Sequence, residues 1–126
     1  MDIRKLQKAV VTALEDIKAR DIEVYDVKHL TSLFDRVVIA SADSARQTKA
    51  LARNVQDNAR KLGARIYGLE GDQTGEWVLV DLGDIVVHIM LPTVRSHYNL
   101  EELWNQPKPR APSKRITRTA NSTKSK

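Results

Sequence analysis

The sequence of 126 residues contains no cysteine. This absence excludes a disulfide-stabilised scaffold, a zinc site with thiolate ligands and a cysteine nucleophile. The longest wholly apolar runs, such as residues 37–40, have four residues, whereas a membrane-spanning helix needs roughly 20. The first residues are charged where a signal peptide would be apolar, so we predict a cytoplasmic protein that has no contact with a membrane.

Negative charge is missing from the C-terminal end of the sequence. Residues 105–126 contain seven of the 21 basic residues and none of the 16 acidic ones, so residues 1–104 have a formal net charge of −2. The segment has three prolines and one large apolar residue, Ile116. Such a composition buries too little apolar surface to offset the entropy of ordering, which predicts a basic disordered tail at 105–126. It is typical either of a solubility tail or of an arm that binds RNA phosphates.

The apolar pattern of the first 70 residues predicts two helices and three strands. In residues 3–20 apolar residues recur at spacings of three and four, as in an amphipathic helix. Residues 22–27, 34–40 and 65–69 are predicted as strands. Ser44 and Gln47 form the pattern of a capping box, which predicts the start of a second helix that ends at Gly63.

Residues 77–81 and 85–90 predict a β-hairpin with the two-residue turn Gly83-Asp84. This turn pairs Trp77 with Met90 and Leu79 with His88. One face of the hairpin is then wholly aliphatic and consists of Val78, Val80, Ile85, Val87 and Ile89. The other face is mixed and consists of Trp77, Leu79, Asp81, Val86, His88 and Met90. A slip of one residue would mix the two sets, so the pattern favours this register.

A last helix is predicted at residues 94–104, opened by Pro92 and Thr93. The order of elements is helix, two strands, helix, strand, hairpin, helix. It predicts one α/β domain at residues 1–104, with a mixed five-stranded sheet and flanking helices that pack mainly on one face.

Two carboxylates near a strand end, Asp81 and Asp84, are the candidate site of an enzyme that uses magnesium in nucleotidyl transfer. Both residues flank a tight turn, and a role in that turn explains Asp84 equally well. The sequence has no glycine-rich phosphate loop and no dinucleotide motif. His29, His88 and His97 have no neighbour at metal-ligand spacing. We therefore predict no catalytic residue, no metal and no cofactor, with the magnesium-dependent enzyme as the alternative.

The mixed face of the hairpin is the second candidate site. It combines an aromatic ring, a thioether, an imidazole and a carboxylate, as the surfaces that bind other proteins do. Tyr98 extends this face if the last helix lies beside the hairpin. In the alternative interpretation that helix covers Trp77, and His88 is an ordinary hydrogen-bonded histidine of the sheet.

Over residues 1–104 the sequence resembles the ribosomal silencing factor family, also called Iojap-related proteins. The hairpin and the last helix are the most specific parts of the resemblance. Two residues depart from the family pattern: Ala42 stands where glycine is usual, and Arg36 where an aromatic residue or cysteine is common. The matching positions are 26–27, 31–32, 35, 38–41, 44–47, 68–71, 77–90 and 95–104.

The resemblance implies a nucleotidyltransferase-like fold without a catalytic site. It implies a translation repressor, not an enzyme, that acts under nutrient limitation and in stationary phase. As partner it implies the large ribosomal subunit, through the subunit protein numbered fourteen, where binding blocks joining of the small subunit. It also implies a homodimer when the protein is free, and the tail is a candidate for contacts with ribosomal RNA. The residues that match the family's docking surface are Trp77 and Tyr98, with Glu70, Asp81, His88, Met90 and Asn99 as neighbours.

Overall fold

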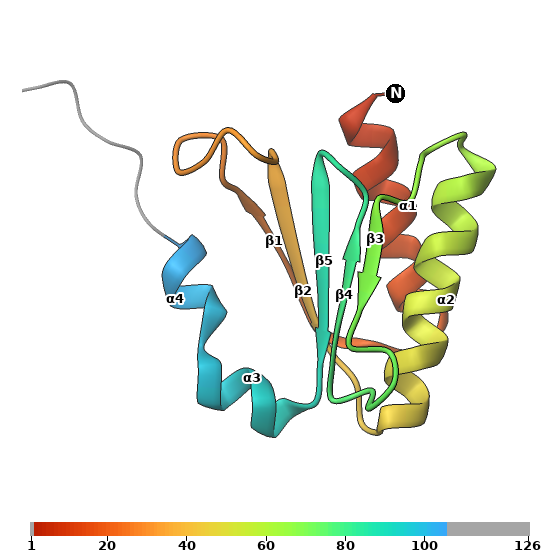
Figure 1. Ribbon diagram of the computed structural model, residues 1–126, viewed down its shortest axis with the longest axis vertical. Helices are drawn as coiled ribbons and strands as arrows, with labels where there is room; N and C mark the ends of the chain where they lie inside the picture. The colour runs from red at the N-terminus through yellow and green to blue at the C-terminus, as the bar shows by residue number, and fades with distance from the viewer. Residues whose placement is uncertain (1, 106–126) are drawn as a thin grey trace, which may run out of the picture.

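The computed structural model describes residues 2–105. The predicted disordered tail lies outside the described residues, apart from Asn105. Figure 1 labels the helices and strands in the order in which they follow along the chain. They are α1 (Ile3–Asp16), β1 (Arg20–Asp26), β2 (Arg36–Ser41), α2 (Ala45–Lys61), β3 (Gly68–Glu70), β4 (Trp77–Asp81), β5 (Ile85–Met90), α3 (Pro92–Tyr98) and α4 (Leu100–Trp104).

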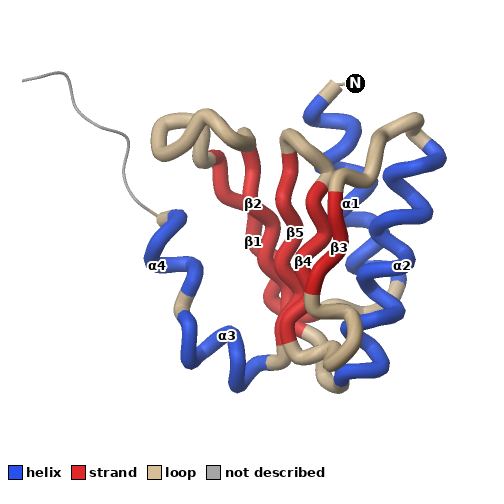
Figure 2. Tube along the Cα trace, viewed as in Figure 1, coloured by secondary structure: helices blue, strands red, loops and turns tan. Residues whose placement is uncertain are grey.

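The five strands form one sheet in the order β1-β2-β5-β4-β3. Strands β2 and β5 are parallel, and the other neighbours are antiparallel. Helices α1 and α2 cover one face, and the shorter α3 and α4 run along the opposite side (Figures 1 and 2). The predicted α/β class, with a mixed five-stranded sheet and flanking helices, is confirmed. No helix within residues 2–105 has the length and apolar character that crossing a membrane requires.

The register of the β4–β5 hairpin is the predicted one. Trp77 pairs with Met90 and Leu79 with His88, and the Leu82 N–H donates to the Ile85 carbonyl across the turn at 2.9 Å. The aliphatic face of the hairpin is fully buried in the main core under α1 and α2. The mixed face therefore points toward α3 and α4, where a smaller core forms around Val37 and Ile39 of β2.

Several predicted boundaries were wrong by a few residues. Helix α1 ends at Asp16 instead of residue 20, because Lys18 adopts a left-handed φ of 67° and turns the backbone toward β1. Strand β1 begins at Arg20, and its pairing with β2 shifts register between Arg20 and Glu23. Strand β2 spans Arg36–Ser41 instead of 34–40. Strand β3 spans only Gly68–Glu70 instead of 65–69.

Helix α2 begins as predicted, but its capping interactions differ from a simple capping box. The Ser44 hydroxyl accepts from the Gln47 N–H at 3.1 Å. The Gln47 side-chain oxygen accepts from Asp43 N–H at 2.7 Å, and its amide donates to the Ile17 carbonyl at 2.9 Å. Gln47 therefore also joins the start of α2 to the end of α1.

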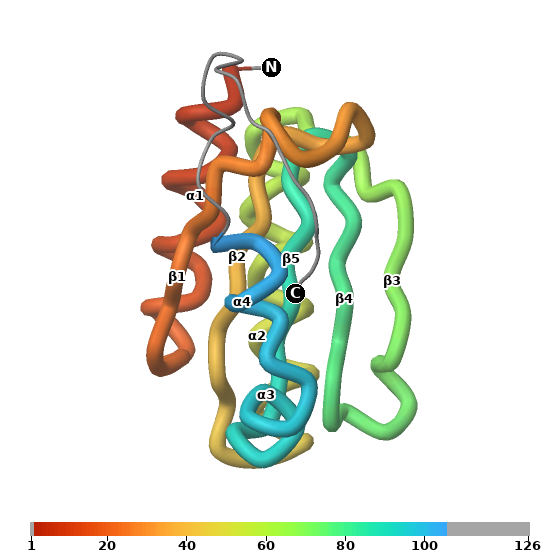
Figure 3. Tube along the Cα trace, turned by 90° about the vertical axis from the view of Figure 1, so that its left-hand side faces the viewer, coloured from red at the N-terminus to blue at the C-terminus, as the bar shows by residue number. Residues whose placement is uncertain are grey.

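The single last helix predicted at residues 94–104 is wrong. Asn99 has a left-handed φ of 50°, which ends α3 and begins α4 in a new direction. Figure 3 shows α3 and α4 as separate short helices in front of the sheet. Leu100 and Trp104 of α4 pack against the small core of β2, so the break allows α4 to cover that strand.

Candidate protein-binding surface

Trp77 and Tyr98 form the centre of the candidate site. Their ring centroids are 4.9 Å apart. Trp77, at the start of β4, is partly buried, and Tyr98, at the end of α3, is 57% exposed. The helix that follows the hairpin therefore contacts the indole ring without covering it, and the pair remains accessible to a partner.

His88 determines how the indole ring is held. The Trp77 indole N–H donates to His88 Nδ1 at 3.0 Å. Trp77 and His88 are diagonal neighbours on β4 and β5, a separation that long aromatic side chains can bridge. Burial lowers the pKa of His88 to about 4, so the ring is neutral near pH 7. The neutral ring keeps Nδ1 free as the acceptor, with its proton on Nε2.

Arg95 holds α3, and with it Tyr98, against the sheet. Its guanidinium is buried and donates to Glu101 of α4 at 2.8 Å and to the Ser41 hydroxyl at 2.9 Å. It also donates to the backbone carbonyl of Asp21 at 2.7 Å. One side chain therefore connects α3, α4, β1 and β2.

An open groove of about 770 Å³ continues from this centre along the same face of the sheet. A smaller hollow of about 280 Å³ adjoins it, lined by Glu70, Gly71, Trp77 and Leu79. Glu70 and Leu79 line both, so the two are continuous. We call the whole area the Trp77 surface. The groove is lined by Leu33, Phe34, Tyr67, Glu70, Leu79, Asp81, Gly83, Asp84, Val86, His88 and Trp104.

The structure places the other predicted site residues at different depths. Glu70 is exposed and pairs with Leu79 across β3 and β4. Asn99 is exposed, and its side-chain amide donates to Glu102. Met90 is fully buried opposite Trp77, so its burial does not support a direct contact with a partner.

Asp81 takes part in the hairpin turn, where its Oδ1 accepts from the Gly83 N–H at 2.8 Å. Asp84, the other carboxylate considered for magnesium, is exposed on the same turn. Within residues 2–105 no group of three or more histidine, aspartate or glutamate side chains is placed to hold a metal ion. The geometry of Asp81 therefore agrees with a role in the turn.

Sequence reasoning missed two exposed side chains of the groove. Leu33 is 80% exposed in the loop before β2, and Tyr67 is 60% exposed just before β3. Leu33 lies between two predicted strands, and Tyr67 lies in the predicted strand at residues 65–69. Both become informative only once the fold places them on the lining of one groove.

Fold and surface together define a class of protein. Exposed aromatic and aliphatic side chains next to carboxylates form the Trp77 surface, and this composition is typical of a site that binds another macromolecule.

Comparison with known proteins identifies the family. The model of the family described as "Ribosomal silencing factor during starvation" matches residues 1–126. The chain is 52% identical over 109 residues to "Ribosomal silencing factor RsfS" of Chromobacterium violaceum, covering 86% of this chain and 89% of that protein. The chain therefore belongs to the ribosomal silencing factor family, whose name describes regulators of the ribosome.

Two further similarities extend the comparison. A crystal structure of a Chromobacterium violaceum protein superposes with a TM-score of 0.82 at 50% identity, covering 90% of this chain and 95% of that one. The mouse protein named "Mitochondrial assembly of ribosomal large subunit protein 1" is 35% identical over 98 residues, covering 75% of this chain and 43% of that protein.

Proposed function

We propose that this protein represses translation by binding the large ribosomal subunit and preventing the small subunit from joining. Its docking partner in this proposal is the large-subunit protein numbered fourteen, on the side that faces the small subunit. Repression operates when nutrients are scarce. Membership of the ribosomal silencing factor family supports a ribosomal target, and the name of the mouse relative supports the large subunit.

The observation that carries the proposal is the accessible pair of Trp77 and Tyr98. Aromatic side chains that are partly exposed and held rigidly are the usual anchors of protein interfaces, because they bury a large area at a small cost in side-chain entropy. Trp77 is held by His88, and Tyr98 lies on a helix held by Arg95. The site is thus preorganised for a partner.

The charges around this pair favour a basic partner. Glu70, Asp81 and Asp84 line the same groove, and residues 1–104 have a net charge of −2. Complementary charge increases the association rate with a basic ribosomal protein more than it increases the affinity. The proposed mechanism breaks no bond, because the bound domain acts by occupying space that the small subunit needs.

The test is sedimentation of the protein with isolated large and small subunits. Trp77→Ala and Tyr98→Ala remove the anchors, and each should weaken binding to the large subunit by about 30-fold, corresponding to about 2 kcal/mol. Leu62→Ala, an exposed apolar residue at the end of α2 on the opposite face, is the matched control and should bind normally. Full binding by both anchor variants, with unchanged thermal unfolding, would exclude the Trp77 surface as the docking site.

We propose two further interactions of the protein, one with a second copy of itself and one with ribosomal RNA. The free protein forms a homodimer through the Trp77 surface, because an exposed apolar patch is covered at low cost by a second copy. The seven basic residues of 105–126 add contacts with ribosomal RNA that are sensitive to salt.

A further inference from the structure

The outward face of α2 has a row of basic side chains that the Trp77 surface does not use. Since successive residues of a helix are about 100° apart, the four side chains of this row, from Arg46 to Arg60, lie within an arc of roughly 60° around the helix axis. Their positions are exposed, and they lie opposite the buried side of the helix, which includes Leu51 and Val55. The basic row consists of Arg46, Lys49, Arg53 and Arg60.

Positive charge is concentrated on this helix. Residues Ala45–Lys61 contain five basic residues and one acidic residue, Asp57, and thus have a net charge of +4. Since residues 1–104 together have a net charge of −2, the residues of 1–104 that lie outside α2 have a net charge of −6. The protein therefore has a basic helix on one face of the sheet and carboxylates lining the groove on the other.

The basic row has little internal neutralisation. Arg60 pairs with Asp57 at 3.6 Å, but both side chains are more than half exposed, and such pairs contribute little. Within the described part of the chain the structure shows no ion pair for Arg46, Lys49 or Arg53. These charges are available to a ligand.

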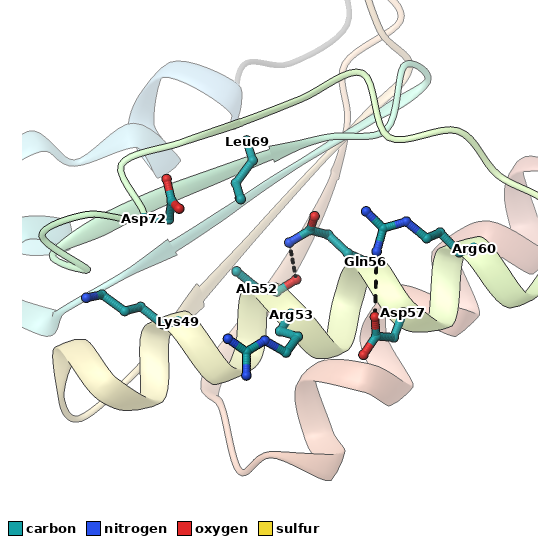
Figure 4. Close-up of a pocket in the computed structure, with 8 residues that line it drawn as sticks. All are labelled: Lys49, Ala52, Arg53, Gln56, Asp57, Arg60, Leu69 and Asp72. Carbon is teal, nitrogen blue, oxygen red and sulfur yellow. Dashed lines mark hydrogen bonds and ion pairs between the residues drawn. The ribbon is translucent and has the colours of Figure 1, made fainter.

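Three members of the row line a hollow of about 370 Å³ between α2 and the edge strand β3. Figure 4 shows Lys49, Arg53 and Arg60 spread along the helix on the border of this hollow. Leu69 of β3 lines it on the other side, and Asp72 adds one carboxylate to its rim. The next residue of β3, Glu70, lines the Trp77 surface. The basic hollow and the Trp77 surface therefore meet at β3.

The chemistry of the row fits phosphates better than bases. Helix α2 has no aromatic residue on which a base could stack. Its amide side chains are already occupied, since Asn54 donates to the Ala13 carbonyl and Gln56 to the Ala52 carbonyl. From Arg46 to Arg60 the row extends about 20 Å at 1.5 Å per residue, enough to follow several phosphates of one strand.

The same face fits an acidic protein less well. Protein interfaces obtain most of their energy from buried aromatic and aliphatic anchors. The exposed positions of α2 between Arg46 and Lys61 offer only Ala50 as an apolar side chain. A partner would meet charges without an apolar centre, which is typical of binding to a phosphate backbone.

We propose that the basic row of α2 is a second contact surface, which binds the phosphate backbone of ribosomal RNA without reading its sequence. The identity of that RNA rests on the proposed function. When the Trp77 surface is docked on a ribosomal protein, the row lies around the edge of β3 from it, where RNA beside that protein is within reach.

The first experiment measures binding of the full chain to a fluorescent RNA duplex as salt is increased. The variant Lys49→Gln/Arg53→Gln removes two charges of the row. It should bind about tenfold more weakly at low salt, and the slope of log affinity against log salt should fall by about 2, one for each lost phosphate contact. The tail is present in every variant, so its contribution is constant.

Arg4→Gln/Lys8→Gln is the matched control. It also removes an exposed arginine and an exposed lysine four residues apart, but from α1. It should leave the slope close to that of the unmodified chain. If the α2 variant binds the duplex no more weakly than this control, the inference is wrong.

The second experiment repeats the titration with isolated large subunits. The α2 variant should dissociate at lower salt than the unmodified chain, whereas Trp77→Ala should bind the subunit about 30-fold more weakly at every salt concentration and keep its affinity for the duplex. Loss of the subunit by the α2 variant with unchanged affinity for the duplex would assign the row to an acidic protein and overturn the inference. Failure of the unmodified chain to bind large subunits would overturn the proposed function. The affinity for the RNA duplex would still test whether the basic row of α2 binds phosphates.

Discussion

At the scale of single residues, His88 explains how the ring of Trp77, the proposed anchor, is held in place. The indole N–H is satisfied inside the protein by His88 Nδ1 at 3.0 Å. A partner therefore meets the ring without having to compensate for an unpaired donor, which would otherwise cost about 1–3 kcal/mol on burial. This arrangement requires the neutral form of His88, because a protonated imidazole has no acceptor.

This requirement makes stability depend on pH. Burial lowers the pKa of His88 from 6.5 to about 4. Between these values the unfolded chain binds a proton that the folded chain does not, so the free energy of unfolding falls as the pH is lowered from 6.5 toward 4. The contribution of His88, fully present above pH 6.5, amounts to about 3 kcal/mol. Urea unfolding at pH 7.5 and pH 4.5 measures most of this contribution, the rest of which is lost only below pH 4.5.

His88→Leu separates this effect from that of other groups. The variant loses the acceptor for Trp77, so it should be less stable at pH 7.5, but its stability should fall less between pH 7.5 and pH 4.5 than that of the unmodified chain. His97→Leu is the control, because His97 is exposed on α3. An equal fall in all three proteins would show that His88 is not the titrating group.

Residue positions on the hairpin were predictable because alternation and turn length fix the register. The sequence could not predict that Met90 is buried while Trp77 remains accessible, although both belong to the mixed face. That difference depends on where α3 and α4 lie. Their position depends on contacts far apart in the chain, such as that between Arg95 and Asp21.

At the scale of elements, α3 and α4 are held by one buried network around Arg95. Its partners come from β1, β2 and α4, and Glu101 is the closest acidic one. The left-handed backbone at Asn99 bends the chain so that Arg95 and Glu101 face each other. Apolar periodicity predicted a continuous helix because it contains no signal for such a bend.

Arg95→Met should destabilise the domain and displace Tyr98. Removing the buried guanidinium leaves the Ser41 hydroxyl and the partly exposed Glu101 carboxylate without their donor, at a cost of about 1–3 kcal/mol. We expect a lower urea midpoint and weaker binding to the large subunit. Arg95→Met/Glu101→Met removes both charges and should recover part of the stability. If the single variant unfolds at the same urea concentration as the unmodified chain, the network does not hold α3.

At the scale of the whole molecule, the sheet separates two surfaces of different chemistry. Aromatic rings and carboxylates are on one side, and the basic row of α2 is on the other. The net charge of +5 conceals this division, since it comes from the tail. Composition alone suggests a basic, nucleic-acid-binding protein, whereas the proposed function gives the groove lined by carboxylates a protein partner.

The proposed homodimer uses the Trp77 surface, and the large subunit competes for it. Sedimentation velocity over a range of concentrations should show dimers of the unmodified chain and monomers of Trp77→Ala. Lys49→Gln/Arg53→Gln, altered on the opposite side of the sheet, should still form dimers. Persistent dimers of Trp77→Ala would require a different dimer interface. The large ribosomal subunit would then not compete with dimer formation.

The tail at residues 105–126 should increase the affinity for the large subunit, while the Trp77 surface determines where the protein docks. Deleting residues 107–126 removes seven positive charges but leaves Trp77 and Tyr98 in place. Because contacts with phosphates weaken steeply as salt increases, the truncated chain should bind large subunits more weakly at low salt and almost normally at high salt. The measurement is co-sedimentation at several salt concentrations. Loss of binding at all of them would make the tail the primary anchor. The aromatic pair would then be secondary, since anchors buried in a protein interface depend little on ionic strength.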